Sequence, residues 1–293
     1  MNSHLAAPAS AAGAAPPLVR DAWPHAATVD AEIDCTLQYV ADGPTDCLFQ
    51  IHALQGMDQQ VLTESLVVTP PLPLRVFADP TLSHRFTRLR VESGEFTLRY
   101  QATVRRTVEA FDPTARLVPI AELPDGLLHN LMPTRYCESD VMSRTAQKLF
   151  GGVAPGAPQV MAVVDWIHQN IDYQIGSTQS TSTAQDVYMQ RAGVCRDFAH
   201  LAVTFCRALN IPARLVAGYA PFDEPPPDFH AVFEAYIGDR WVVFDPTRLA
   251  APEHVVRIAS GRDAKDVAFA SLFGPARMLA MAPEIRVVGY RNV

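Results

Sequence analysis

The chain has 293 residues, of which 48% are hydrophobic and 19% charged, and its formal net charge is −7 at pH 7. This length and composition suit two folded domains with sizeable hydrophobic cores and exclude a chain that is disordered throughout. The negative charge argues against non-specific binding to nucleic acids or anionic membranes, because both need clustered Lys and Arg. No apolar run reaches the ~20 residues that a membrane-spanning helix needs.

The N-terminus and the cysteines bear on the compartment. The first 18 residues are rich in Ala and Pro and lack the basic start and apolar centre of a signal peptide. We therefore expect residues 1–22 to be a flexible tail and the protein to be cytoplasmic. The five cysteines are too sparse for a disulfide framework. Cys35 and Cys47 flank a turn-like segment, so one disulfide bond between them stays an alternative. Cys137 and Cys206 are expected to be buried packing residues.

Residues 23–108 carry strand signals with almost no helical periodicity. β-Branched and aromatic residues cluster or alternate in several short runs separated by turn residues. The runs are residues 36–40, 48–52, 62–68, 86–91 and 95–104. Their spacing predicts an N-terminal β-sandwich. This region contains no cluster of a nucleophile, a base and metal ligands, so its expected role is support or substrate docking.

Residues 109–157 hold many prolines and are interpreted as a connector with one short helix over residues 143–150. A second helix begins near Val160, where apolar residues recur at three- and four-residue steps. We expect it to open a second domain over residues 158–293. The last apolar strand, residues 285–290, is expected to complete the sheet of this second domain.

The segment GVCRDFAH, residues 193–200, lies between two predicted helices. A capping-box pattern at Thr183 begins the first helix, and Gly193 is expected to end it. The second helix follows from the apolar spacing after Phe198 and ends before Pro212. Cys195 thus lies in the first turn of a buried helix, where free N–H groups and the helix dipole favour a thiolate. Thiols so placed can have a pKa of roughly 3.5 to 7.5, which makes Cys195 a candidate nucleophile.

Two β-prone runs, residues 230–237 and 240–246, flank the pair Gly238-Asp239. This pattern predicts a β-hairpin with a two-residue turn, in which Val232 lies opposite Asp245. Because side chains alternate between faces, His230 and Asp245 become diagonal neighbours, about 7–8 Å apart between backbones. An imidazole and a carboxylate can hydrogen-bond across that gap. His230 is therefore a candidate base and Asp245 its orienting group.

A thiol at a helix N-terminus, followed by His and Asp on neighbouring strands, resembles the transglutaminase-like cysteine enzymes. The chain resembles the bacterial transglutaminase-like proteins, commonly described as cysteine proteases, in GVCRDFAH, in ALNIPARLVAGY and in the hairpin that closes on FDPT. LMPTRYCESD and IASGRDAKDV resemble the family more weakly. The resemblance implies an α+β fold, in which a β-sandwich-like domain precedes a papain-like core with a helix-borne Cys and an antiparallel sheet. Val232 stands where the family usually has an aromatic residue, and Phe229 where small or polar residues are common, which affects substrate fit more than the triad.

The candidate residues also have structural interpretations. Taken alone, Cys195 and His230 could be core residues and Asp245 a turn former, but their predicted geometry favours catalysis. Asp197 falls in the first helical turn, where a carboxylate satisfies free N–H groups, so we expect a structural role. A zinc ion held by Cys195, His230 and Asp245 would lack a clear fourth ligand. We expect neither a metal nor a cofactor.

These residues predict a cysteine-dependent hydrolase of amide or peptide bonds that acts through a thioester. The Cys195 thiolate attacks the carbonyl, His230 protonates the leaving amine, and Asp245 orients the imidazole. The backbone N–H of Cys195 is one expected oxyanion donor, and the second is Tyr188, Gln190 or a backbone group. Transfer of the acyl group to an amine uses the same triad, and a non-catalytic binding scaffold is a further alternative. The expected partner is a peptide or protein amide rather than a nucleic acid or membrane, and the sequence makes no prediction of the oligomeric state.

Overall fold

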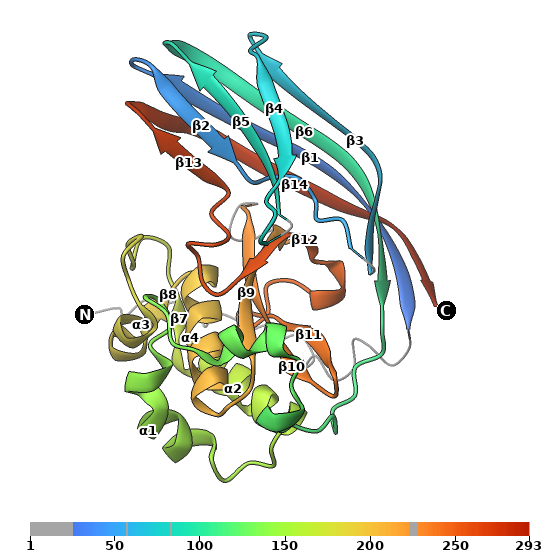
Figure 1. Cartoon of the computed structure of the whole chain (residues 1–293), viewed down its shortest axis with the longest axis vertical. Helices are drawn as coiled ribbons and strands as arrows, with labels where there is room; N and C mark the ends of the chain where they lie inside the picture. Colours follow the sequence, from blue (N-terminus) through green and yellow to red (C-terminus); the bar gives the residue numbers. More distant parts are fainter. Residues whose placement is uncertain (1–25, 57, 83, 223–227, 293) are drawn as a thin grey trace, which may run out of the picture.

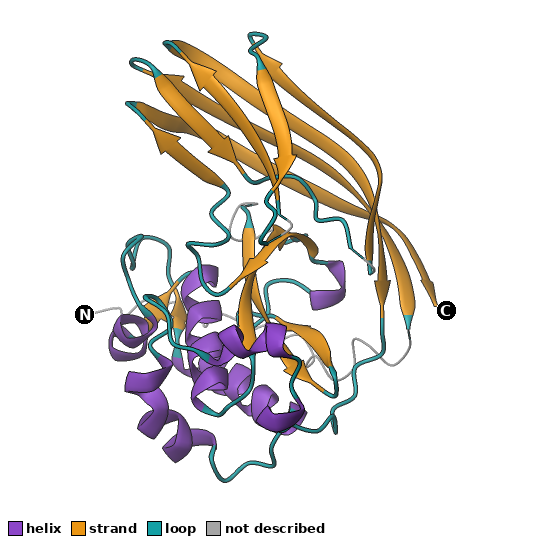
Figure 2. Ribbon diagram, viewed as in Figure 1, coloured by secondary structure: helices purple, strands orange, loops and turns teal. Residues whose placement is uncertain are grey.

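The structure, a computed structural model, describes residues 26–56, 58–82, 84–222 and 228–292. A long β-sandwich lies next to a domain in which helices pack on a smaller sheet (Figures 1 and 2). This mixed architecture confirms the α+β fold class predicted from the sequence. The predicted tail, residues 1–22, lies outside the described residues.

The sandwich is made of two antiparallel sheets of four strands each, as the strand signals predict. The first sheet has the strand order β14 (Ala276–Asn292), β1 (Ala27–Ala41), β6 (Gly94–Val108) and β3 (Gln59–Thr69). The second sheet has the strand order β13 (Ala270–Phe273), β2 (Thr45–Phe49), β5 (Arg85–Val91) and β4 (Leu74–Ala78).

The core between the two sheets follows from the alternation of side chains along each strand. Every second residue of β1, from Ala27 to Ala41, is buried, because successive side chains of a strand point to opposite faces. The rings of Tyr39, Phe49 and Phe96 meet between the sheets with centroids 5.3 to 6.5 Å apart. Each such pair stabilises the fold by about 0.5–1.5 kcal/mol beyond the burial of its area. Cys35 and Cys47 are both free and buried in this core.

The C-terminal strand corrects one prediction. Instead of completing the sheet of the second domain, β14 pairs along its length with β1, and β13 pairs with β2. Residues 270–292 therefore return to the sandwich, and the second domain does not extend to residue 293. Pro283 fits this position, because β14 lies at the edge of its sheet and proline is tolerated in edge strands.

The second domain is built around an antiparallel sheet and the helix α4 (Cys195–Ala208), which packs on it. The strand order is β11 (Arg240–Phe244), β10 (His230–Ile237), β9 (Ala213–Tyr219) and β12 (Val256–Gly261). Three helices contact α4, namely α1 (Ser139–Phe150), α2 (Ala157–Asn170) and α3 (Ala184–Gln190). A short parallel pair, β7 (Asp172–Tyr173) and β8 (Ala192–Gly193), lies near the start of α4. All residues from Asp197 to Arg207 of α4 are buried, so the helix is enclosed on every side and not only along the stripe that its apolar spacing predicts.

The helices confirm the predicted pattern with shifted boundaries. The helix predicted at 143–150 begins earlier, at Ser139, and the connector before it also holds 3₁₀ turns at Ile120–Glu122 and Asp125–Leu131. Thr183 and Asp186 form the predicted capping box of α3. The predicted stop at Gly193 is wrong, because α3 already ends at Arg191, whose φ of 62° is left-handed. Gly193 has a different role, since a Cβ there would come within 2.8 Å of the Asp197 side chain.

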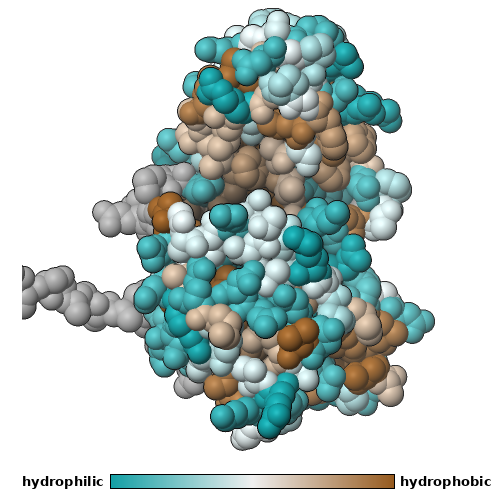
Figure 3. All heavy atoms as spheres, turned by 90° about the vertical axis from the view of Figure 1, so that its left-hand side faces the viewer, coloured by the Kyte–Doolittle hydropathy of each residue, from teal (hydrophilic) through white to brown (hydrophobic). Residues whose placement is uncertain are grey.

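One face of the molecule carries a hydrophobic band. In the space-filling view, hydrophobic residues gather in a hollowed band across the upper part, whereas the lower part is hydrophilic with smaller hydrophobic patches (Figure 3). Within the described residues, no helix is long and apolar enough to cross a membrane. The cytoplasmic location stays a prediction.

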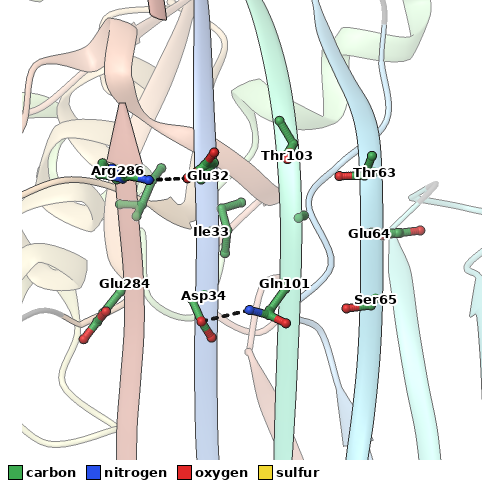
Figure 4. Close-up of a pocket in the computed structure, with 12 residues that line it drawn as sticks. Glu32, Ile33, Asp34, Thr63, Glu64, Ser65, Gln101, Thr103, Glu284 and Arg286 are labelled. Atoms are coloured by element: carbon green, nitrogen blue, oxygen red, sulfur yellow. Dashed lines mark hydrogen bonds and ion pairs between the residues drawn. The ribbon is translucent and has the colours of Figure 1, made fainter. Parts of the chain in front are cut away.

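The outer face of the first sandwich sheet forms a hollow of about 600 Å³ (Figure 4). Polar side chains from four neighbouring strands line it. Arg286 donates to Glu32 over 2.6 Å, and Gln101 donates to Asp34 over 3.0 Å. Such cross-strand pairs are typical of a solvated sheet face.

Candidate active site

Cys195 is the first residue of α4, as predicted, and Asp197 holds the start of this helix. The Asp197 carboxylate is fully buried and accepts the backbone N–H of Val194 over 3.0 Å. It also accepts the hydroxyl of Thr178 over 2.5 Å, which ties the preceding loop to the helix start. This arrangement confirms the structural role expected for Asp197.

The hairpin that carries the other two candidates has the predicted register. Gly238 and Asp239 form its turn with φ angles of 56° and 64°, the two positive values that a type I′ turn needs. Ile237 pairs with Arg240, and the ladder continues to Phe233 and Phe244. Asp245 follows directly after the last pair.

His230 and Asp245 meet as the register predicts. The His230 Nε2 lies 2.9 Å from Asp245 Oδ2, and each side chain is about 1% exposed. Asp245 also accepts three further hydrogen bonds, from the backbone N–H of Thr247 (2.8 Å), its hydroxyl (2.6 Å) and the backbone N–H of Ala250 (3.0 Å). Burial raises the pKa of Asp245, but the charge of His230 and these hydrogen bonds outweigh it and hold the pKa below its ordinary value. The group is therefore a carboxylate that can orient and stabilise a protonated imidazole.

The thiol of Cys195 lies near the same imidazole, close enough to affect the pKa of His230. Because Nε2 is taken by Asp245, Nδ1 is the nitrogen available to the sulfur, and in the described chain it has no hydrogen-bond partner. Burial lowers the pKa of His230, but the charges of Asp245 and Cys195 outweigh burial and raise it to about 10. The ring is therefore protonated at neutral pH. The structure thus brings the three predicted residues together, while their catalytic roles stay a prediction.

Tyr173 is a further residue at the thiol, and the sequence analysis did not single it out. It lies opposite Gly193 in the β7–β8 pair, and its ring packs on Phe198 with centroids 5.9 Å apart. Its hydroxyl lies close enough to Cys195 for both the backbone N–H and the side chain of that residue to affect the pKa of the phenol. Burial first, and then the charge of Cys195, raises the pKa of the phenol, so the group keeps its proton at neutral pH.

The two side chains considered for the second oxyanion donor are engaged elsewhere. The ring of Tyr188 stacks on Trp166 at 5.7 Å, and the guanidinium of Arg191 lies 4.3 Å from the Tyr188 ring centroid. The amide nitrogen of Gln190 donates to the carbonyls of Ser177 (3.0 Å) and Ala192 (2.9 Å). The amide N–H groups of Gln190 are therefore occupied, whereas the contacts of Tyr188 are made by its ring.

Comparison with known proteins agrees with this geometry. The family model of the transglutaminase-like superfamily matches residues 143–246, and that of the bacterial transglutaminase N-terminal domain matches residues 30–126. The crystal structure of a "putative cysteine protease" from Cytophaga hutchinsonii is 42% identical, covers 89% of this chain and 91% of that one, and has a TM-score of 0.85. The chain belongs to the transglutaminase-like superfamily.

Relatives of this transglutaminase-like protein also occur in mycobacteria. An uncharacterized protein of Mycobacterium leprae is 29% identical over 196 residues, which is 61% of this chain and 68% of the relative. An uncharacterized protein of Mycobacterium tuberculosis is 32% identical over 116 residues, or 34% of this chain and 37% of that relative. These relatives support the family and carry no stated activity.

The two segments that resemble the family more weakly both contact His200, the last residue of GVCRDFAH. Tyr136 of LMPTRYCESD stacks on the His200 ring at 5.3 Å, and the backbone N–H of Ala264, in GRDAKDV, donates to His200 Nε2 over 3.0 Å. Burial first, and then Arg196, lowers the pKa of His200 to about 3, so this ring is neutral. Both segments therefore support the helix that carries the thiol.

Access to solvent separates Cys195 from the other cysteines of this transglutaminase-like protein. Cys195 is partly exposed, whereas the other four are buried. Burial raises the pKa of Cys35 and Cys137 to about 12 and that of Cys47 to about 11, so these thiols stay protonated at neutral pH. Over the described ranges, no group of three or more His, Cys, Asp or Glu has the arrangement of a metal site.

Proposed function

We propose that this protein is a cysteine-dependent hydrolase of amide or peptide bonds, with Cys195, His230 and Asp245 as its triad. One observation carries the proposal. The partly exposed thiol in the described chain adjoins a buried imidazole whose other nitrogen bonds a carboxylate over 2.9 Å. This is the order of groups that nucleophilic catalysis by a thiol needs.

The reaction begins with attack of the Cys195 sulfur on the carbonyl carbon of the substrate. A carbon–sulfur bond forms, and the carbonyl electron pair moves to the oxygen. When this intermediate collapses, the carbon–nitrogen bond breaks and His230 gives its proton to the leaving amine. Water then attacks the thioester, the imidazole accepts a proton from that water, and the carboxylic acid leaves while the sulfur regains its electron pair. Asp245 holds the ring in place through both halves.

The developing oxyanion needs hydrogen-bond donors next to the sulfur. The backbone N–H of Cys195 and the hydroxyl of Tyr173 are the two donors assigned here, since the phenol lies near both the N–H and the thiol of Cys195. In this proposal the substrate carbonyl oxygen enters between them and receives both hydrogen bonds. Tyr173 therefore takes the role of the second donor.

Replacing Tyr173 with Phe tests that role, because the ring and its packing on Phe198 stay while the donor is lost. We expect acylation of Cys195 to slow by on the order of 10²-fold, as when one oxyanion donor is removed. Alkylation by iodoacetamide should be unchanged or faster, because displacement at a saturated carbon forms no oxyanion. Rates of thioester formation and of alkylation, both followed by intact-protein mass spectrometry, give the comparison. Equal slowing of both reactions would assign Tyr173 to positioning the thiol instead.

Alkylation also tests the triad. With limiting iodoacetamide at neutral pH, peptide mapping should find Cys195 modified before the other four cysteines, because those are buried. His230→Ala should slow this modification on the order of 10²-fold, while Cys206→Ala should leave it unchanged. Five equally slow thiols would favour the non-catalytic scaffold.

The acceptor of the acyl group is water in this proposal, because water needs no binding site of its own. The alternative is an amine, as in a transglutaminase, and the same triad serves both. A library of glutamine-containing and other amide peptides, incubated with and without an added primary amine, separates the two outcomes by mass. Gain of the amine in the product, rather than of water, would establish acyl transfer.

A further inference from the structure

A cavity of about 540 Å³ is lined by residues of the sandwich and of the second domain, among them residues of β6 and β11. Its walls combine arginine side chains with apolar residues. The arginines are Arg106 on β6, Arg214 on β9, Arg240 on β11 and Arg257 on β12, and the apolar wall includes Val108, Val242 and Trp241. Its volume is in the range of small-molecule sites. None of the triad residues lines it.

Arg106 is buried at the floor of this cavity and is only partly satisfied. It is 5% exposed, and its Nη1 donates to the carbonyls of Pro252 (3.2 Å), Glu253 (3.0 Å) and Val255. Its Nε has no hydrogen-bond partner in the described part of the chain, and its Nη2 makes no hydrogen bond there either. Burial first, and then the charge of Arg257, lowers the pKa of Arg106 to about 10, and the group stays charged at neutral pH.

Arg214 presents a second incompletely paired guanidinium. Its Nε donates to the buried carboxylate of Glu234 over 2.6 Å, and its guanidinium carbon lies 4.2 Å from the centroid of the Trp241 ring. The two Nη atoms have no hydrogen-bond partner among the described residues. Because Glu234 and Trp241 fix the plane of the guanidinium, its free N–H groups are pre-organised for a ligand.

The arginine charges around the cavity are balanced by nearby carboxylates. Asp58 and Glu109 line the cavity with the four arginines. Glu234 and Glu253 do not line it, but Glu234 pairs with Arg214 and Arg257, and the charge of Glu253 acts on Arg106.

We propose that this cavity binds a small organic monocarboxylate, with the carboxylate between Arg106 and Arg214 and its apolar or aromatic body against Val108 and Val242. The planar guanidinium favours carboxylates because it can donate two parallel N–H bonds to them. Because nearby carboxylates balance the arginines, a monoanion leaves less uncompensated charge in the cavity than a phosphate dianion. An inorganic anion would leave part of the cavity unfilled, because it has no apolar body to pack against the apolar wall.

The proposed site is separate from the triad and independent of the proposed function. Glu234 lies four residues after His230 on β10, a distance of roughly 13 Å along the strand. Buried valines fill the space between them on the same face of the sheet, including Val216, Val232 and Val243. Binding can therefore be measured without any turnover.

The test uses sodium benzoate as the probe and benzamide as its neutral counterpart, on the full chain. Arg214 and Arg240 both line the cavity, but only Arg214 has free Nη groups, because Arg240 donates to Glu109 and to the carbonyl of Ala110. Arg214→Gln removes a proposed carboxylate donor, and Arg240→Gln is the matched control with the same change of charge. We expect benzoate to bind the wild type and to raise its Tm, with no effect of benzamide. Arg214→Gln should weaken benzoate binding at least about tenfold, whereas Arg240→Gln should change it less than about threefold.

Calorimetric titration and the melting temperature with each probe give the outcome. Lack of benzoate binding would overturn the proposal, and so would equal binding of benzamide. Equal affinities of Arg214→Gln and Arg240→Gln would place benzoate elsewhere, for example in the catalytic cleft as a product mimic, and would also overturn it. Inorganic phosphate binding more tightly than benzoate would contradict the assignment to an organic monocarboxylate.

Discussion

Asp245→Asn is expected to lower the rate of amide hydrolysis by about 10³–10⁴-fold, while the protein remains folded. The carboxylate accepts four hydrogen bonds, from His230, twice from Thr247, and from Ala250. An amide at this position can accept at only one of its two heavy atoms, so it either holds the wrong imidazole tautomer or repels a backbone N–H. It also removes the negative charge that stabilises the protonated ring. Hydrolysis of a peptide selected from the library, measured as kcat/KM, gives the size of the loss.

The pH dependence separates this effect from a general loss of structure. The pKa of His230 is raised to about 10, so the wild-type ring keeps its proton below that pH and the leaving amine can be protonated. The alkaline limb of kcat/KM should therefore lie near pH 10 in the wild type. In Asp245→Asn the main cause of the raised pKa is gone, and the limb should move towards the ordinary histidine value of about 6.5. An imidazole NMR titration of His230 measures the same shift without a substrate.

The same shift affects stability, with a sign that follows from the direction of the pKa change. A folded histidine that binds its proton more tightly than the unfolded one stabilises the fold fully below the unfolded pKa, and this stability is lost as the pH rises through the folded pKa. The wild type should thus lose unfolding free energy between about pH 6.5 and 10, and Asp245→Asn should lose much less over this range. Thr247→Ser, which can keep both hydrogen bonds to Asp245, is the matched control and should behave as the wild type. An unchanged His230 pKa in Asp245→Asn would contradict the assigned role of the carboxylate.

The parts of the site that the sequence predicted are those fixed by local geometry. The Gly238-Asp239 turn has two residues, so the pairing of Ile237 with Arg240 determines every later pair of the hairpin. The position of Cys195 follows similarly from the helix that begins at it. Short-range rules of this kind need only the turn type and the alternation of side chains.

The parts that could not be predicted depend on contacts between distant segments. The alternation in β14 shows that it is a strand, but nothing in it specifies β1 as its partner rather than the sheet of the second domain. Tyr173 reaches the thiol only because β7 pairs with β8, and each of these strands has two residues, too short for a periodic pattern. The hydrogen bond from Ala250 to Asp245 depends on the path of a loop after Pro246. In each case the missing information is tertiary placement, which overrides local propensity.

Glu234→Gln is expected to lower the free energy of unfolding by about 3–5 kcal/mol. Glu234 is fully buried between two arginines, and it accepts from Arg214 over 2.6 Å and from Arg257 over 2.9 Å. Arg257 also pairs with Asp58, next to β3 of the sandwich, so the network connects the two domains. Removing the central carboxylate leaves the buried guanidinium of Arg257 with one partner, and an incompletely compensated buried charge is costly. Glutamine keeps the volume of the side chain, so the loss reports the charge rather than a cavity.

An exposed ion pair in the same protein provides the control for this prediction. Asp34 and Arg99 pair over 2.5 Å on the outer face of the sandwich, where both side chains are more than a third exposed. Asp34→Asn should therefore cost at most about 1 kcal/mol, because solvent screens the pair. Urea unfolding at several pH values measures both variants.

The charge of Glu234 also makes the stability depend on acidic pH. Burial raises the pKa of Glu234, but its arginine neighbours outweigh burial and lower the pKa below its ordinary value. The stabilising effect of Glu234 is therefore present above the unfolded pKa and is lost as the pH falls. Glu234→Gln should accordingly unfold with a weaker dependence on acidic pH than the wild type. Equal losses in the buried and exposed variants would show that the network contributes no more than a surface pair.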